Sequence, residues 1–370
     1  MAEKLLAYEV PDVSRIESPA VLIYWDRLMA NVESMLRIAK KPQRLRPHCK
    51  THKIREVARV LVDRGVTRHK AATFSEVEML ASAGAKDICL AYNVVGPNIR
   101  RTIECAEKFP QTRLSVLADD RRPIAELSVQ ALLARQTIGV WLDVDTGLRR
   151  SGVASLDDAV ALYEQISGCE YLEPAGLHVY DGQNHQVDID ERRRAVDQVW
   201  RHTQRLREAL AVRNLPVPAV VVGGTGSFPI FAGMDDPTIE LSPGTVVIYD
   251  AGYAANFPDL PFTPAAALLT RVISRPASDR VTLDLGHKAC AADPPLERRA
   301  IFPQLPDAQI VLHNEEHLVI TTKSAAGFSP GDAMLAIPWH VCPTIALHRQ
   351  VHIVKDGQVT GQWVVAARDR

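Results

Sequence analysis

The sequence predicts an α/β fold in which a (β/α)8 barrel of the TIM type is followed by an antiparallel β domain. Short apolar runs alternate with helical patterns as far as Leu241, and a polar residue follows most of these runs. Alternating strands and helices form parallel βαβ units, and eight such units close into a barrel. After Ala254 the helical periodicity fades and prolines cluster. This change marks the second domain.

One strand and one helix precede the alternating region. Residues 20–24 form an apolar run after Pro19 and predict a strand. Apolar residues recur at near-helical spacing over 28–38, behind Asp26, which can cap a helix. Residues 42–45 then predict a turn and the first strand of the barrel.

The rest of the barrel is predicted from composition and periodicity. Runs typical of buried strands lie at 69–72, 87–91, 113–117, 139–144, 174–179, 219–222 and 238–241. Helical patterns lie between them at 54–64, 75–83, 98–109, 124–133, 156–166 and 190–213. With the strand before Lys50 the strand count reaches eight. A doubly wound open sheet is the alternative, but no Gly-x-Gly-x-x-Gly follows an early strand.

The second domain is predicted from short β-like runs. They lie at 268–273, 281–285, 309–312, 318–321, 333–337, 351–354 and 363–366, with a turn signal at Asp356-Gly357. We expect residues 25–254 to form the barrel and residues 1–24 and 255–370 to form the β-rich domain.

Composition limits the classes of function. A net charge of −1 over 370 residues gives no electrostatic basis for binding nucleic acid or an anionic membrane. No apolar run is long enough to span a bilayer, and residues 1–4 lack the basic-then-apolar order of a signal peptide. The six cysteines are scattered, which is typical of free thiols in a reducing compartment. We expect a cytoplasmic protein.

The segment from Arg46 to Lys53 holds two lysines and two histidines within eight residues. Burial and nearby cations both favour the neutral form of a lysine, which is the nucleophilic form. His48, His52, Arg46 and Lys53 would provide such a setting for Lys50. The segment is therefore a candidate Schiff-base site at the end of a strand. A solvated basic turn is the alternative, because charge runs usually face water.

Polar residues from distant parts of the sequence would meet at one end of this barrel. The active site of such a barrel forms at the C-terminal ends of its strands. The residues at or just after predicted strand ends are Lys50, Thr73, Asn93, Asp145, Tyr180 and Gly223.

A glycine-rich loop, Gly223-Gly224-Thr225-Gly226-Ser227, follows a predicted buried strand. Such a loop exposes backbone N–H groups to an anion, and Thr225 and Ser227 add hydroxyl donors. A phosphate site commonly forms late in a barrel of this type. A tight flexible turn is the other interpretation.

Two other loops carry candidate side chains. An arginine in the loop from Asp145 to Gly152 could orient a carboxylate, a phenolate or a ring nitrogen, or could merely fix the loop through Asp145. His178 and Tyr180 share one side of the next strand by alternation, and a histidine there could move protons near neutral pH.

A candidate metal pair lies in the second domain at His340-Val341-Cys342. On an extended segment these two side chains would project from the same face. An imidazole with a thiolate suits zinc best, although a complete site needs further ligands. Cysteines and histidines are also common as purely structural residues.

The segment from Arg46 to Lys53 resembles the signature of pyridoxal-phosphate enzymes related to D-threonine aldolase and eukaryotic D-serine dehydratase, within the alanine racemase-like group. The similarity continues in order through Val95-Gly96-Pro97, Asp145-x-Gly147-x-x-Arg150-x-Gly152, Gly176-Leu177 with Tyr180 and Gly182, Gly223 to Ser227, Glu240-Leu241 with Gly244 and Asp250, Asp284-x-Gly286-x-Lys288, Asn314 to His317, and His340-x-Cys342-Pro343-Thr344. It implies a barrel that binds pyridoxal phosphate, followed by a β domain, usually in a homodimer.

The same resemblance implies roles for individual residues. Lys50 would hold the cofactor, and His48 and His185 would be the other catalytic candidates. The remaining cofactor-binding candidates are Arg150, Tyr180, Gly224, Thr225, Gly226, Ser227, Tyr249 and Asp250. His340 and Cys342 would hold a divalent metal, zinc or manganese, against the hydroxyl group of a 3-hydroxy amino acid.

The resemblance leaves two reactions open. The pair His340-x-Cys342 looks like that of the dehydratases, whereas the aldolases of this family carry His-x-Asp. Tyr180-x-Gly182 with a nearby histidine resembles the aldolase pattern, although His185 stands one residue closer than that pattern requires. We expect a D-threonine aldolase, with a dehydratase of D-serine or 3-hydroxy-D-aspartate as the alternative. A racemase and a non-catalytic cofactor-binding protein are further alternatives.

Overall fold

The structure, a computed structural model, describes residues 8–9 and 11–370, and its internal contacts divide the chain into two compact units. The first unit comprises the described residues up to Met35, Thr51–Ile54 and Thr245–Arg368. The second comprises Leu36–Lys50, Arg55–Gly244 and Asp369–Arg370. The expectation about a signal peptide at residues 1–4 lies outside the described residues. Within the described part, no helix is long and apolar enough to cross a membrane.

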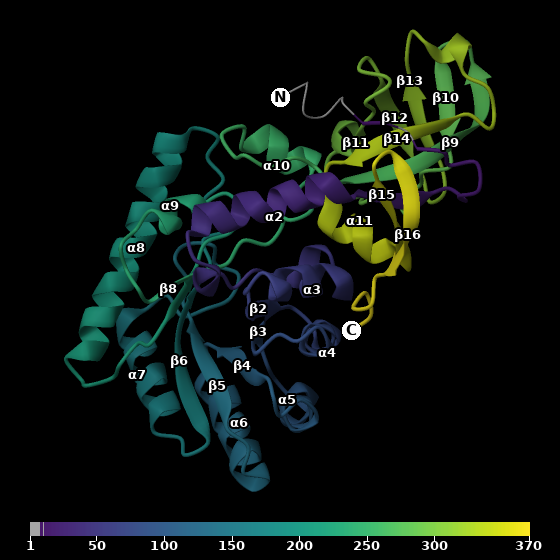
Figure 1. The fold of residues 1–370 in the computed structure, drawn as a ribbon. Helices are drawn as coiled ribbons and strands as arrows, with labels where there is room; N and C mark the ends of the chain where they lie inside the picture. Colours follow the sequence, from purple (N-terminus) through teal and green to yellow (C-terminus); the bar gives the residue numbers. More distant parts are fainter. Residues whose placement is uncertain (1–7, 10) are drawn as a thin grey trace. The chain divides into compact units, whose positions relative to one another are not determined.

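The second unit is built on a curled parallel sheet with helices on its outside (Figure 1). Within the described residues its strands pair in chain order: β2 (Arg68–Ala71), β3 (Asp87–Asn93), β4 (Arg113–Ala118), β5 (Ile138–Asp143), β6 (Leu172–Val179), β7 (Val220–Val222) and β8 (Ile239–Leu241). The helices are α3 (Arg55–Asp63), α4 (Phe74–Ser82), α5 (Pro97–Lys108), α6 (Arg121–Ala134), α7 (Leu156–Ser167), α8 (Ile189–Ala211) and α9 (Phe228–Ala232). These elements confirm the predicted alternation.

The eighth strand position is filled by a short bridging segment. Leu45 pairs in parallel with Leu241 of β8, and His48 pairs in parallel with Lys70 of β2. The segment therefore links the two edges of the sheet. Residues 42–44, expected to lead into a full strand, instead form a 3₁₀ turn, Pro42–Arg44, and a second such turn, Cys49–Thr51, carries Lys50.

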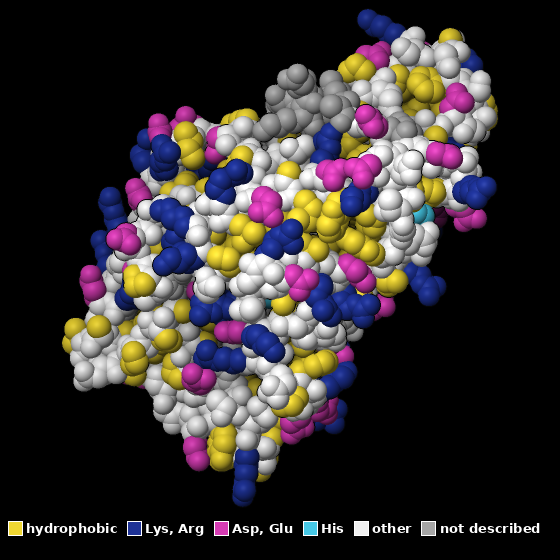
Figure 2. Space-filling model, in the orientation of Figure 1, with side chains coloured by type: hydrophobic (Ala, Val, Ile, Leu, Met, Phe, Trp, Pro, Cys, Tyr) yellow, Lys and Arg dark blue, Asp and Glu magenta, His cyan; other side chains and the backbone are white. Residues whose placement is uncertain are grey.

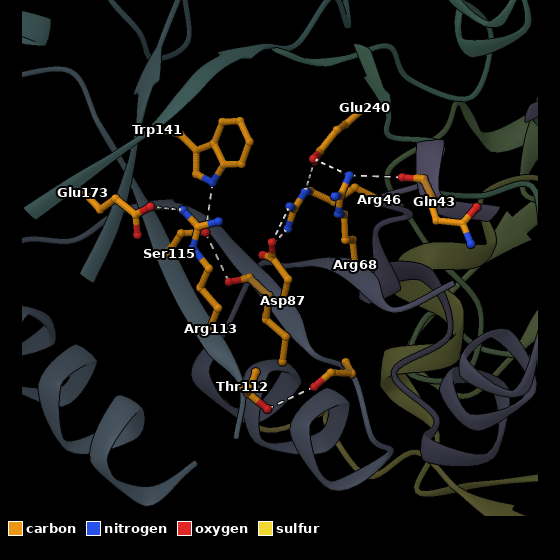
Figure 3. Close-up of polar contacts among 12 residues, drawn as sticks. Gln43, Arg46, Arg68, Asp87, Thr112, Arg113, Ser115, Trp141, Glu173 and Glu240 are labelled. Carbon is orange, nitrogen blue, oxygen red and sulfur yellow. Dashed lines mark hydrogen bonds and ion pairs between the residues drawn. The ribbon is translucent and has the colours of Figure 1, made fainter. Parts of the chain in front are cut away.

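A buried ion-pair network lies where this segment meets the strands, and Figure 3 shows its members. The guanidinium of Arg46 donates two hydrogen bonds to Asp87, at 2.7 and 3.0 Å, and pairs with Glu240. Arg46 also lies over the ring of Trp141, 5.2 Å from its centroid. Arg68 donates to the other oxygen of Glu240 at 2.9 Å. These pairs tie the bridging segment to β3 and β8.

The first unit contains a second sheet. Within the described residues its strand order is β12 (Gln309–His313), β13 (Leu318–Thr321), β10 (Arg280–Leu283), β9 (Ala266–Ala277), β1 (Ala20–Tyr24), β15 (Gln350–Lys355) and β16 (Gln358–Val364); β14 (Ala333–Pro338) also pairs with β9, and β11 (Ala300–Ile301) with β14. All pairs are antiparallel except β1 with β15. The predicted antiparallel domain is thus a mixed sheet.

Helix α2 (Trp25–Ala39) follows β1 directly, as its periodicity predicts, and α10 (Ala251–Asn256) and α11 (Val341–Leu347) accompany the second sheet. The core of this unit packs apolar side chains of β1, β9 and β14 together, among them Leu22, Leu269 and Leu335. Figure 2 shows basic and acidic side chains interspersed over the visible face. That mixture accords with the net charge of −1.

Candidate functional site

A cavity of about 540 Å³ lies in the second unit, among residues from the bridging segment and from the ends of several strands. Lys50 lines it together with His48, Lys70, Ala72, Ala91, Tyr92, Asn93, Val95, Leu117, Asp143, Arg150, Ser151, His178 and Tyr180. Three of the residues expected at strand ends, Lys50, Asn93 and Tyr180, therefore meet here. Thr73 and Asp145 do not line this cavity: Thr73 caps α4, and Asp145 accepts N–H groups of its own loop.

The surroundings of Lys50 differ from the expected cluster of cations. His48 lines the same cavity, and its Nδ1 accepts the backbone N–H of Lys50 at 3.3 Å. Arg46 does not line the cavity, because its guanidinium is held by Asp87 and Glu240. The parallel strands bring these two acidic residues to Arg46 from far along the chain, which the sequence analysis did not anticipate.

A second lysine, which the sequence reasoning missed, is buried in the cavity. Lys70 on β2 is 4% exposed, and its Nζ lies 3.2 Å from Nε2 of His178. Nδ1 of His178 lies 2.7 Å from Oδ1 of Asp143, and Ser151 donates to Oδ2 of Asp143 at 2.9 Å. Burial is the main cause that lowers the pKa of Lys70, to about 8. The sequence signal that could have identified Lys70 is a charged residue within a strand of only four residues.

Tyr180 forms one wall of the cavity, with the Arg150 guanidinium 5.0 Å from its ring centroid. Two glycines make room for the ring. A Cβ on Gly182 would lie 2.5 Å from Cε1 of Tyr180, and one on Gly224 would lie 3.4 Å from Cε2. A side chain at Gly182 would therefore displace the ring.

The glycine-rich loop lies between β7 and α9, and at Gly224 it approaches the ring of Tyr180. Ser227 accepts the Gly224 N–H at 3.0 Å and donates to Asp181 at 2.9 Å. Thr225 is buried as well. Beside the loop, Ser242 donates its N–H to Val222, yet its buried hydroxyl has no partner among the described residues. The loop is thus held by hydrogen bonds of Ser227, and it lies beside the buried hydroxyl of Ser242, which has no partner among the described residues.

The candidate metal pair belongs to the first unit. His340 caps α11 and Cys342 lies in the first turn of that helix, so the expected extended segment was wrong. Pro343 explains the difference, because proline is tolerated in the first turn, where N–H groups lack helical partners. Cys342 still influences His340, because it raises the pKa of that imidazole. Cys342 also contacts the hydroxyl of Thr51 at 3.1 Å.

An acidic residue that the sequence reasoning missed completes this group. Asp293 Oδ2 lies 2.5 Å from Nδ1 of His340, and both residues line a cavity of about 270 Å³ with Asp250. Burial opposes protonation of His340, but Cys342 and Asp293 outweigh it and raise the pKa of His340 to about 9. Burial raises the pKa of Asp250 to about 6. No local spacing in the sequence links Asp293 to this pair.

The predicted site residues that do not line the cavity around Lys50 include Tyr249, Asp250 and His185. Tyr249 is buried in the first unit against Phe262. Asp250 caps α10 through the Tyr253 N–H and also accepts the Val341 N–H, beside His340. His185 is exposed on the loop after β6. His185 belongs to the same unit as the cavity, whereas Tyr249 and Asp250 belong to the first unit.

Among the described residues, the potential ligand atoms of His48, Cys49 and Glu76 lie within 4.8 Å of one another, close enough to hold a metal ion. The Glu76 carboxylate already accepts the Ala72 N–H and the Cys49 thiol. These bonds engage Glu76, in the first turn of α4, with Cys49 and with the backbone just before that helix.

Comparisons with known proteins agree with this architecture. Residues 23–249 match the family model "alanine racemase, N-terminal domain", and residues 265–354 match "putative serine dehydratase domain". The chain is 32% identical over 368 residues to a D-threonine aldolase of an Arthrobacter species, covering 96% of this chain and 94% of the relative. It is 26% identical over 382 residues to a 3-hydroxy-D-aspartate aldolase of Paracoccus denitrificans, covering 99% and 97%. The crystal structure of D-threonine aldolase from Filomicrobium marinum superimposes with a TM-score of 0.88 at 30% identity, covering 98% of this chain and 99% of that one.

Proposed function

Because the chain belongs to the alanine racemase-like family that includes D-threonine aldolases, we propose that it is a D-threonine aldolase dependent on pyridoxal phosphate and a divalent metal. It would cleave D-3-hydroxy amino acids to glycine and an aldehyde. The observation that carries the proposal is the meeting of Lys50, Tyr180 and Arg150 in one cavity. The similarity to two aldolases over nearly the whole chain supports it.

The residues present fit pyridoxal phosphate. Lys50 would hold its aldehyde carbon, Tyr180 and Arg150 would flank its ring, and Gly224, Thr225, Gly226 and Ser227 would receive its phosphate. Two leftover buried atoms support this fit: the hydroxyl of Ser242 beside the loop and Oδ1 of Asn93 in the cavity have no partner among the described residues. When bound, the cofactor supplies a sink for the electron pair left when a bond to Cα breaks.

The donor set at His340 and Cys342 fits a divalent metal. An imidazole, a thiol and the Asp293 carboxylate suit zinc, and the carboxylate also suits manganese. A metal held there would supply a Lewis acid for the substrate's hydroxyl group.

The protein's own groups have separate tasks in this proposal. Arg150 and Tyr180 orient the bound molecule, and the apolar wall formed by Ala91, Val95 and Leu117 keeps water away from part of it. His48 lies beside Lys50 and is the histidine of this segment that can exchange a proton in the cavity. We further propose a homodimer, as the resemblance implies, and a location in the cytoplasm, which is a reducing compartment that suits scattered free cysteines.

A dehydratase that releases ammonia and a 2-oxo acid is the second candidate. The pair His340-x-Cys342 and the match of residues 265–354 to a serine dehydratase domain favour it. In that reaction Lys50 would remove the Cα proton.

The proposal is tested with Lys50→Ala and the matched variant Lys53→Ala. Purified protein is incubated with pyridoxal phosphate, reduced with borohydride and digested, and the labelled peptide is identified by mass spectrometry. We expect the label on Lys50 in the wild type and in Lys53→Ala, and consumption of D-threonine but not L-threonine. A label on Lys53, equal use of both enantiomers, or racemisation of alanine would overturn the proposal.

A further inference from the structure

We propose that Lys70 is a catalytic residue that carries the proton of the substrate's β-hydroxyl group, with His178 and Asp143 as the positioning residues behind it. This inference rests on the proposed aldolase function and deepens it. Lys70 lines the same cavity as Lys50, although it is otherwise buried on β2. It is the second amine available to a molecule bound there.

The hydrogen bonds around Lys70 fix how His178 behaves. Nδ1 of His178 faces Oδ1 of Asp143 at 2.7 Å, and a carboxylate can only accept, so Nδ1 carries the hydrogen. Nε2 is then the acceptor, and the Lys70 amine donates to it across 3.2 Å. This contact uses one N–H group of Lys70 as a donor. The lone pair of the neutral amine therefore remains available to accept a proton.

The charges around Lys70 make its neutral form accessible near neutral pH. Burial is the largest cause that lowers its pKa, to about 8, and the nearby charges of Lys50 and Arg46 lower it further. Cys89 on β3 and Asp143 on β5 act in the opposite direction. The other titratable or charged groups that line the cavity are His48, Tyr92, Arg150, His178 and Tyr180. A base with a pKa near the working pH combines a large neutral fraction with useful basicity.

In the proposed reaction Lys70 alone accepts the proton and later returns it. The neutral amine takes the β-hydroxyl proton, the O–H electron pair becomes the second bond of the aldehyde carbonyl, and the Cα–Cβ bond breaks. The pair from that bond stays with the glycine half until the Lys70 ammonium returns the same proton to Cα. Lys70 ends neutral, and no further reactant is needed.

The first test measures the basicity of Lys70 without the cofactor. Cofactor-free protein is labelled with trace acetic anhydride at a series of pH values, and the acetylation of Lys70 is compared by mass spectrometry with that of exposed Lys86. We expect half-maximal reactivity of Lys70 near pH 8, well below the value of about 10.4 for a lysine in water. Half-maximal reactivity of Lys70 at about pH 10 or above would overturn the inference.

The second test uses Lys70→Arg, with Lys86→Arg as the matched control. The arginine keeps the charge but cannot act as a base at neutral pH. We expect kcat to fall at least about 100-fold, the range of general acid–base catalysis, while KM for D-threonine and the absorbance of bound cofactor are retained. In the wild type, kcat should rise with pH to a plateau above about pH 8, because the neutral amine is the active form.

The outcomes separate this inference from the proposed function. A rise in KM with kcat unchanged would make Lys70 a carboxylate-binding group and overturn its role as a base. An active wild type with an equally active Lys70→Arg variant would overturn the inference alone. A wild type that leaves D-threonine intact would overturn the proposed function and this inference with it.

Discussion

Nζ of Lys70 lies 3.2 Å from Nε2 of His178, so a lysine amine is held inside the barrel by a neutral acceptor. Burial, with Lys50 and Arg46 nearby, lowers the pKa of Lys70 from 10.5 to about 8. The unfolded chain therefore binds this proton more tightly than the folded protein does. Stability should rise as the pH increases from about 8 to about 10.5, by at most about 3 kcal/mol from this group.

The first prediction isolates this pH dependence with Lys70→Met. The variant lacks the titrating amine. The free energy of unfolding of the variant minus that of the wild type should therefore be largest below pH 8, and this difference should fall towards pH 10. Urea unfolding at several pH values measures the difference, and Lys86→Met serves as the exposed control. A difference that does not change with pH would show that Lys70 titrates alike in both states.

The second prediction concerns the ion pairs that close the barrel. Arg46→Met leaves Asp87 and Glu240 buried without their shared cation, and such a loss costs about 3–5 kcal/mol. The exposed pair of Arg100 with Glu104 provides the control, because removing an exposed pair costs at most about 1 kcal/mol. Urea midpoints of Arg46→Met and Arg100→Met compare the two. Similar losses would contradict the structural role of Arg46.

The third prediction tests how Tyr180 is seated. In Gly182→Ala the new Cβ would lie 2.5 Å from the Tyr180 ring, so the ring must move. We expect the affinity for pyridoxal phosphate to fall at least about tenfold, which is about 1.4 kcal/mol. Gly327→Ala is the control, because its Cβ meets no atom within 4 Å. Fluorescence titration with the cofactor measures both variants, and unchanged affinity in Gly182→Ala would remove Tyr180 from the cofactor site.

The fourth prediction addresses the metal. The double variant His340→Ala with Cys342→Ala should lose metal-dependent cleavage of D-threonine and keep the absorbance of bound cofactor, because Lys50 is untouched. Metal content is measured by elemental analysis, with Cys169→Ala as a control for the loss of a thiol outside the proposed metal group. Full activity in the presence of a strong chelator would argue against the metal.

The elements of both sheets follow from local periodicity, which is why β3, β6 and α8 lie close to their predicted ranges. Convergence of Lys50, Asn93 and Tyr180 also followed from sequence, because the ends of parallel strands meet at one edge. Lys70 was missed because a lysine within a strand usually faces water. Its position in the cavity depends on the curl of the sheet, which is a tertiary property.

The details that the structure corrects also depend on contacts between residues far apart in the sequence. Arg46 was assigned to the Lys50 site from its place in the sequence, whereas Asp87 and Glu240, which bind it, lie 41 and 194 residues away. Asp293 meets His340 across 47 residues. The segment from His340 to Cys342 was treated as extended, whereas α11 begins at Val341 and holds Pro343 in its first turn.

The central claim is tested most directly by identifying the products formed from D-threonine. Purified protein with pyridoxal phosphate and a divalent metal is incubated with D-threonine, and glycine, acetaldehyde, ammonia and 2-oxobutyrate are quantified in the same sample. The account predicts glycine and acetaldehyde in equal amounts, without ammonia. Ammonia with 2-oxobutyrate would contradict the aldolase and establish the dehydratase, and the absence of both product pairs would contradict either lyase activity.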